Sequence, residues 1–342
     1  MRHLLKKFKL AMNTNTTNVD INDVDCKSFL KKYIDRPFIY IPNPGNAGDK
    51  LIAYGTYQAF NDLGLEFTVG EFHHEYENQL LVYGGGGNLV GTYGNCRNFL
   101  LKNKDRNKIL VLPHTIREEQ ELLASLDDNV TLMCREAVSY DYVKSVVKYP
   151  ENVYISHDMA FYSHIPAHYL NREGYGVCNA YRNDPEMTFS ELPKNNIDLS
   201  SWLDKQGLSE SDVDTVANQL FDYISNYATV NTNRLHIAIA GTLLGKEVNF
   251  FGNNYYKNFA VYERSLAERS SVTFRDNSFF NEEIGDDKNV ALRRQEVDAL
   301  KDAAVSISES NPALAYKLLF IASRARRGPV ILNKLKELSD KF

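Results

Sequence analysis

The chain has 342 residues, of which 43% are hydrophobic, 24% charged and 12% aromatic. This composition excludes a disordered, collagenous or disulfide-scaffold protein, and the length predicts two domains or one domain with appendages. The 39 Lys and Arg residues against 44 Asp and Glu residues leave a net charge of −5, which argues against a general nucleic-acid binder. An anionic ligand must therefore be held by a few placed cations or backbone N–H groups.

The four cysteines lie far apart and form no CxxC pair. This spacing indicates a reducing compartment and argues against a structural zinc site. Apolar runs stay far below the ~18 residues of a membrane span, and residues 1–10 are too short in apolar length for a secretory signal. We therefore expect a cytoplasmic protein that begins with a solvated tail. The alternative is weak contact of this basic tail with an anionic membrane, at its inner face.

From about residue 37 to 165, short apolar runs alternate with helical patterns. The predicted strands span residues 38–41, 80–83, 109–112, 131–134 and 153–156, and the helices between them span 49–63, 93–103, 118–125 and 136–148. This alternation predicts βαβ units and a parallel sheet with helices on both faces. In such sheets the loops at the carboxyl ends of the strands form the ligand crevice.

A second α/β pattern follows an irregular stretch at residues 166–200, which contains one strand at 174–180. A helix at 209–225 with Ser209 as N-cap precedes a strand at 227–230, a helix at 235–244 and a strand at 247–251. We predict an N-terminal segment (1–36), two Rossmann-like domains (37–165 and 166–282) and a helical extension (283–342). The extension is either a packing appendage or a docking surface for a partner or membrane.

Common nucleotide and metal motifs fail on spacing. The run from Gly84 to Gly87 lacks G-x-G-x-x-G spacing, and Lys246 is followed by a glutamate where a P-loop requires Ser or Thr. The Asp23-Val24-Asp25 motif precedes the first strand of the sheet, so we expect it to cap a helix rather than bind a metal.

Two glycine-rich loops directly follow predicted strands. The first, residues 43–49, reads Asn-Pro-Gly-Asn-Ala-Gly-Asp and contains Gly48 and Asp49; the second contains Gly85 and Gly86 and ends at Asn88. Small residues let backbone N–H groups approach an anion, and four successive glycines indicate that a ligand or another backbone comes close. A tight turn is the alternative for each loop alone, but two neighbouring loops favour a ligand site.

Polar side chains follow most of the other strands. In the first half they are His114, Arg117, Arg135, Glu136 and Asp158. In the second half they are Arg182, Asp184, Arg234, His236 and Lys257. Any one of them could be a surface cap or an ion pair.

Arg234 and His236 lie about 200° apart on an ideal helix, so both face one ligand only if the first turn is distorted. A cation at a helix N-terminus is unfavourable, which suggests either an anionic ligand between them or an ion pair with Asp184 or Glu186.

The ordered set of motifs resembles the polysaccharide pyruvyltransferase family over roughly residues 38–265. The resemblance rests on Asn46-Ala47-Gly48-Asp49, Gly84 to Gly87, Leu112-Pro113-His114-Thr115, Cys134-Arg135-Glu136, Asp158, Arg182-Asn183-Asp184-Pro185-Glu186, Asn233-Arg234-Leu235-His236 and Tyr256-Lys257-Asn258. The family more often has Asp at the position of Asn233 and Gln at that of His114. The first difference removes a carboxylate near His236, and the second adds a titratable group.

The resemblance implies two Rossmann-like halves facing a cleft, as in GT-B glycosyltransferases. It also implies transfer of pyruvate from phosphoenolpyruvate to two sugar hydroxyls as a ketal, in cell-surface or exopolysaccharide synthesis. Phosphoenolpyruvate is a co-substrate, and neither a further cofactor nor a metal is required. By match to the family, Arg135, Arg234 and His236 bind the donor, with Arg117, Arg182 and Lys257 in a secondary role.

Ketal formation needs an acid and a base, each worth ~10²–10⁴ in rate. His236 is the expected acid, and Asp49, Asp158 and Glu136 are the candidate bases. The saccharide acceptor is lipid-linked or free. Two other functions stay open: a nucleotide-sugar glycosyltransferase of similar architecture, and a non-catalytic relative that serves as an assembly protein.

Overall fold

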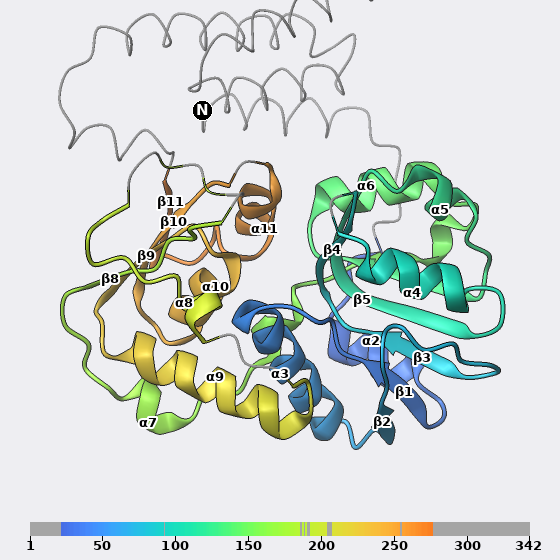
Figure 1. Cartoon of the computed structure of the whole chain (residues 1–342), viewed down its shortest axis with the longest axis horizontal. Helices are drawn as coiled ribbons and strands as arrows, with labels where there is room; N and C mark the ends of the chain where they lie inside the picture. The colour runs from blue at the N-terminus through green and yellow to red at the C-terminus, as the bar shows by residue number, and fades with distance from the viewer. Residues whose placement is uncertain are drawn as a thin grey trace, which may run out of the picture. The chain divides into compact units, whose positions relative to one another are not determined.

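The structure, a computed structural model, describes residues 22–275 apart from 92, 185, 186, 188, 190, 191, 204–206 and 254. Both sheets of this described part belong to one compact unit, which comprises residues 21–253 and 257–277 (Figure 1). The predicted helical extension at 283–342 and the basic tail at 1–10 lie outside the described residues. The predicted domain boundaries therefore stay a prediction.

The first sheet has seven parallel strands among the described residues. Its strand order is β2-β1-β3-β5-β6-β7. Strand β4 pairs with the end of β5 that follows the part paired with β3. The strands are β1 (Phe38–Ile41), β2 (Phe67–Val69), β3 (Leu80–Tyr83), β4 (Gly86–Val90), β5 (Lys108–Arg117), β6 (Val130–Cys134) and β7 (Val153–Ile155). The helices are α2 (Cys26–Tyr33), α3 (Ala47–Asp62), α4 (Asn95–Asn103), α5 (Gln120–Ala124) and α6 (Ala137–Val146). Two short 3-10 helices, η1 (Pro150–Asn152) and η2 (Met159–Tyr162), flank β7.

The second sheet has four parallel strands in the described part of the chain, in the order β11-β10-β9-β8. They are β8 (Val177–Asn179), β9 (Thr229–Thr232), β10 (Glu247–Phe251) and β11 (Val272–Arg275). The helices are α7 (Ala167–Leu170), α8 (Leu199–Trp202), α9 (Glu210–Ser225), α10 (Leu235–Leu243) and α11 (Lys257–Ser265). The prediction of an α/β protein with parallel sheets is confirmed.

Two hydrophobic clusters form the core. One fills the face of the first sheet covered by α4, α5 and α6. The other runs from α2 and α3 to α9, α10 and the second sheet without interruption. Helix α3 packs against α9, so it contacts both the first sheet and the second half of the chain (Figure 1).

Local sequence signals explain several element boundaries. Asp25 caps α2 by accepting a hydrogen bond from the Ser28 N–H, as expected for the Asp-Val-Asp motif. Ser209 caps α9 in a reciprocal capping box with Asp212, which confirms the predicted start of that helix. No helix of the described residues has both the length and the apolar character needed to cross a bilayer.

The glycine run departs from the prediction of a simple loop. Gly86 and the next glycine begin β4, which pairs with the second half of the ten-residue β5. A β-carbon on Gly84 would lie 2.7 Å from the backbone nitrogen of Asn43, and one on Gly85 would lie 2.8 Å from the carbonyl oxygen of Pro113. Real β-carbons do not come this close, so the first two glycines are required by neighbouring backbone.

Candidate active site

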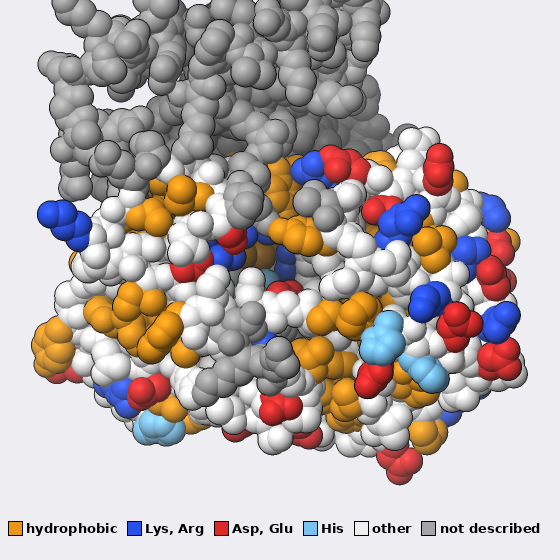
Figure 2. All heavy atoms as spheres, viewed as in Figure 1, with side chains coloured by type: hydrophobic (Ala, Val, Ile, Leu, Met, Phe, Trp, Pro, Cys, Tyr) orange, Lys and Arg blue, Asp and Glu red, His pale blue; other side chains and the backbone are white. Residues whose placement is uncertain are grey.

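Charged side chains converge where several strands and helices meet. The first turn of α3 supplies Asp49, and the loops after β6 and β7 supply Arg135 and Asp158. Helix α10 supplies His236, and α11 begins with Lys257. Figure 2 shows a hollow in this region, with His and with acidic and basic side chains visible inside it. These side chains thus gather near the carboxyl ends of the parallel strands, where sheets of this kind bind ligands.

Asp158 lies between two cationic groups. Its Oδ2 accepts a hydrogen bond from Arg135 Nη1 at 2.7 Å and lies 3.4 Å from His236 Nε2. Its Oδ1 accepts a third bond from the Ala160 N–H at 2.8 Å. Arg135 is further fixed by a bond from its Nε to Thr115 Oγ1 at 2.9 Å. Asp158 therefore sets the orientation of both cations.

The charge state of Asp158 follows from this surrounding. Complete burial alone would raise the pKa of the carboxyl, but His236 and Arg135 outweigh it and hold that pKa well below the usual range. Asp158 is therefore ionised at neutral pH.

Asp49 occupies a different environment at the start of α3. Its Oδ2 accepts a bond from the Asn46 N–H at 3.1 Å in a capping box, and its Oδ1 accepts one from Asn43 Nδ2 at 3.2 Å. Burial raises the pKa of the Asp49 carboxyl above its usual value, although His236 and Arg135 act in the opposite direction. A raised pKa suits a carboxyl that exchanges a proton during a reaction.

The capping box also limits what the loop at residues 43–49 can bind. The Gly48 N–H donates to Asn46 Oδ1 at 2.8 Å, and the Asp49 N–H donates to the Asn46 carbonyl at 3.0 Å. These donors of the first turn of α3 are therefore already used inside the protein. The expectation that the loop offers free N–H groups to an anion is not supported at these two positions.

The exposed fractions of these side chains differ, and they show which side chains can be reached from solvent. The side chains of Asp158 and Arg135 are 0% and 2% exposed, whereas that of His236 is 14% exposed. Asp49 and Lys257 are also half-buried rather than buried. His236 and Asp49 are therefore reachable from solvent, whereas Asp158 is covered by its neighbours.

Two glycines leave room beside these cations. A β-carbon on Gly48 would lie 2.6 Å from His236 Nδ1, and one on Gly87 would lie 2.8 Å from Arg135 Nη2. Because Arg135 is held by Asp158 and Thr115 through its other nitrogens, Nη2 is the part of its guanidinium that faces the half-buried Gly87. Gly87 therefore leaves Nη2 of Arg135 uncovered by a side chain on that side.

We expect Gly87→Ala to raise the KM for an anionic substrate roughly 10- to 100-fold, because a blocked charge-assisted hydrogen bond costs about 1.5–3 kcal/mol. Steady-state kinetics of the variant measures this effect. Gly94→Ala is the matched control, since its added β-carbon meets only the exposed Asn98 side chain at 3.2 Å. An unchanged KM in Gly87→Ala would show that Arg135 does not contact the ligand by this path.

Arg234 and Arg182 belong to a separate ion-pair cluster. Arg234 Nε donates to Asp198 Oδ1 at 2.9 Å, and its Nη2 pairs with Asp184 Oδ2 at 2.9 Å and with Asp198. Arg182 Nε donates to Asp184 Oδ1 at 2.7 Å. Of the two explanations for a cation at this helix start, the ion pair with Asp184 is the one found, and Glu186 lies outside the described residues. Arg234 and His236 contact different groups, as their spacing on a helix predicts.

Three other predicted site residues have identifiable partners. Glu136 is buried and caps α6 by accepting the Ser139 N–H at 2.9 Å. Arg117 pairs with the adjacent Glu118 at the end of β5. His114 is buried, and this burial, with Arg135 nearby, lowers its pKa to about 3. His114 is therefore neutral at physiological pH and does not add a charge to the site.

Asparagine side chains link His114 to Asp49. His114 Nε2 lies 2.9 Å from Asn88 Oδ1, and the Asn88 amide donates to Asn43 Oδ1. Asn43 in turn donates to Asp49. Asn88 was predicted as part of the site and Gly87 as part of a loop that supplies N–H groups, but Asn43 and Asp198 were not assigned roles. Asn43 directly precedes a proline in the first glycine-rich loop, which was the only available signal.

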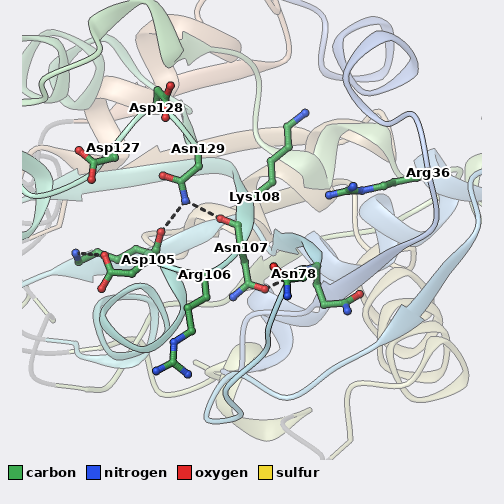
Figure 3. Close-up of a pocket in the computed structure, with 11 residues that line it drawn as sticks. Arg36, Asn78, Asp105, Arg106, Asn107, Lys108, Asp127, Asp128 and Asn129 are labelled. Carbon is green, nitrogen blue, oxygen red and sulfur yellow. Dashed lines mark hydrogen bonds and ion pairs between the residues drawn. The ribbon is translucent and has the colours of Figure 1, made fainter.

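A second hollow lies at the amino ends of the strands of the first sheet, opposite the carboxyl ends described above. It has a volume of about 660 Å³ and is lined by residues that precede β1, β3, β5 and β6 (Figure 3). Its lining includes Arg36, Asn107 and Asn129, and Asn129 donates to the backbone carbonyl of Asn107. None of the predicted site residues lines it.

The family comparison agrees with the site at the strand ends. Residues 46–255, more than half of the chain, match the family described as polysaccharide pyruvyl transferase. The chain belongs to this family. Asp49, Arg135, Asp158 and His236 fall inside the matched range, and Lys257 lies just beyond it. No curated protein matches the chain.

One solved structure is similar over most of its length. It is the crystal structure of a functionally uncharacterized protein, KP1_0663, from Klebsiella pneumoniae subsp. pneumoniae NTUH-K2044. The two sequences are 35% identical, with a TM-score of 0.65, and the match covers 73% of this chain and 96% of the other.

Proposed function

We propose that the protein is a pyruvyltransferase that moves pyruvate from phosphoenolpyruvate onto two hydroxyls of a saccharide as a ketal. One observation carries this proposal: buried Asp158 orients Arg135 and His236, while half-buried Asp49 lies beside them. A fixed cation and two reachable proton-transfer groups are what this donor and this reaction require.

Arg135 and Lys257 are the proposed binding groups for the phosphate and carboxylate of the donor. Arg135 Nη2 faces Gly87, and Lys257 lies close enough to both Gly87 and Asp49 to interact with them. Arg234, Arg182 and Asp184 would instead hold the segment before α8 against the start of α10, and so keep His236 in place. Their contribution to donor binding is therefore indirect.

The reaction balances without a further reactant. His236 gives a proton to the methylene carbon of the donor as the first sugar hydroxyl forms a bond to the adjacent carbon. Asp49 takes the proton of that hydroxyl. The carbon–oxygen bond to phosphate then breaks, and the departing phosphate takes the proton held by Asp49. The second hydroxyl adds to the same carbon and gives its proton to His236, which restores both groups. The products are the ketal and inorganic phosphate.

Asp158 and Glu136 receive supporting roles in this scheme. Asp158 is ionised and 0% exposed, so it orients His236 and Arg135 instead of taking a proton from the acceptor. Glu136 caps α6 and so supports the strand end that carries Arg135. Asp49 remains as the base.

The wider assignment follows the family. We propose that the two sheets form the halves of a GT-B-like arrangement, with the hollow as the cleft between them. The acceptor is a saccharide used for a cell-surface or secreted polysaccharide, free or lipid-linked, and the reaction takes place in the cytoplasm at or near the inner membrane face.

Incubation with phosphoenolpyruvate and a panel of galactosides, mannosides and glucosides tests the proposal. We expect phosphate release that depends on the acceptor, together with a product whose mass increases by one pyruvate ketal. Omission of the acceptor is the control for simple hydrolysis of the donor. Hydrolysis of a nucleotide sugar, with no response to phosphoenolpyruvate, would replace this function by glycosyl transfer.

A further inference from the structure

Asn43 is a buried amide that contacts the proposed base. The residue is only 2% exposed, and its side-chain Nδ2 donates to Asp49 Oδ1 at 3.2 Å. A β-carbon on Gly86 would lie 2.4 Å from this Nδ2, so the glycine leaves the space that the amide occupies. Asn43 is thus held at one position between the glycine run and α3.

The surrounding donors determine which way the Asn43 amide points. The Tyr83 hydroxyl donates to Asn43 Oδ1 at 3.2 Å, and the Asn88 Nδ2 donates to the same oxygen. Because both neighbours supply protons to Oδ1, the NH₂ group must point away from them. It therefore points toward Asp49.

The other end of this chain of bonds lies at His114. Its Nε2 is 2.9 Å from Asn88 Oδ1 and 3.4 Å from the Asn88 backbone nitrogen. The shorter contact favours the tautomer in which Nε2 carries the proton and donates to Oδ1. This fixes the Asn88 amide in turn, with its oxygen toward His114 and its nitrogen toward Asn43. His114, Asn88 and Asn43 therefore form a directed series of hydrogen bonds that ends at Asp49.

We propose that Asn43 is a positioning residue that keeps Asp49 ionised and correctly aimed for proton abstraction; this role rests on the proposed pyruvyl transfer. The hydrogen bond stabilises the carboxylate over the neutral acid and so opposes the effect of burial. The other groups that act on Asp49 are His236 on α10, Arg135 after β6, Lys257 at the start of α11 and Tyr83 on β3. Asn43 differs from the charged groups because it is neutral and donates directly to Oδ1 of the carboxylate, while the Asn46 N–H holds Oδ2.

Substitution of Asn43 tests the role through proton affinity as well as rate. In Asn43→Ala we expect the pKa of Asp49 to rise, because its carboxylate loses a hydrogen bond that stabilises the ionised form over the neutral acid. The acid limb of the kcat profile should move to higher pH, and kcat at neutral pH should fall roughly 10- to 100-fold. Carbon-13 NMR of labelled Asp carboxyls reports the Asp49 titration, with Asp49→Asn used to assign its signal.

Asn103→Ala is the matched control. Asn103 is also a fully buried asparagine, and its side chain donates to the Phe99 carbonyl in α4 at 3.1 Å. This variant should lose stability without moving either the Asp49 titration or the pH profile. Tyr83→Phe is the second variant if Asn43→Ala does not fold, since it removes only the hydroxyl that orients the Asn43 amide. It should shift the Asp49 titration in the same direction.

The outcomes separate this role from the proposed reaction. One outcome is that the pKa of Asp49 rises in Asn43→Ala while the wild-type protein shows no transfer from phosphoenolpyruvate. That result would overturn the proposed reaction and leave the hydrogen-bond series intact. An Asp49 titration and pH profile unchanged in both Asn43→Ala and Tyr83→Phe would overturn the positioning role. If Asn43→Ala lowers kcat but leaves the pH profile unchanged, as in the Asn103→Ala control, the positioning role is also overturned.

Discussion

Replacing His236 with Ala is expected to lower kcat by ~10²–10⁴ while the protein stays folded. The imidazole is the reachable member of the pair with Asp158, and Ala leaves no group to protonate the donor. Because its contact with Asp158 is long, at 3.4 Å, we expect little loss of packing or hydrogen-bond energy. Acceptor-dependent phosphate release measures the rate, and circular dichroism measures the fold.

His164→Ala is a suitable control for the His236 variant. The side chain of His164 is 60% exposed and pairs with Asp62 at 3.1 Å on the surface. It should retain the wild-type rate. Normal turnover by His236→Ala would rule out His236 as the acid and leave Lys257 as the remaining reachable cation of the site.

Replacing Asp158 with Ala is expected to lower the free energy of unfolding by about 3–5 kcal/mol at pH 7, because the Arg135 guanidinium is left buried without its counter-ion. The Arg135–Asp158 pair is almost fully buried, at 2% and 0% exposure, so solvent does not screen the loss. Urea denaturation measures this change. Activity should also fall, since both cations lose the group that orients them.

The stability change should depend on pH in a defined direction. The pKa of Asp158 is lower in the folded protein than in the unfolded chain, so its stabilising effect is fully present above the unfolded pKa. The effect is lost as pH falls through the folded pKa. The difference in stability between wild type and Asp158→Asn should therefore be largest at neutral pH and shrink in acid.

Asp222→Asn provides the comparison for an exposed ion pair. Asp222 is 58% exposed and pairs with Arg172, so its removal should cost about 0–1 kcal/mol. An equal loss of stability in the Asp158 and Asp222 variants would show that the buried pair contributes no more than a surface pair.

Hydrophobic patterning predicted most of the strands, including the edge strands β7 and β8, but it missed β2, β4 and β11. The continuous apolar runs of β3 and β6 are unambiguous, because both faces of a central parallel strand are buried. The strands β2 and β11 were missed since they are short edge strands with partly exposed side chains. Helix α2 was missed although Asp25 marks its start.

Site residues were predictable where a charged residue comes directly after a strand in the sequence. Arg135 and Asp158 lie immediately after β6 and within a few residues of β7, so position along the chain was sufficient to nominate them. Pairing partners were not predictable in the same way. Arg234 binds Asp198, which lies 36 residues away in an irregular segment, and local spacing carries no information about such a contact.

Helix α3 makes the two halves mechanically dependent on each other. Tyr57 on α3 donates to the Leu208 carbonyl at 2.7 Å, and Tyr54 packs on Phe221 of α9 with ring centroids 5.9 Å apart. Swinging the halves apart as rigid bodies would strip these side chains from their partners and wet an apolar interface. We therefore expect ligand entry and release to rely on small local rearrangements around the hollow, with the separation of the two sheets kept constant through each turnover.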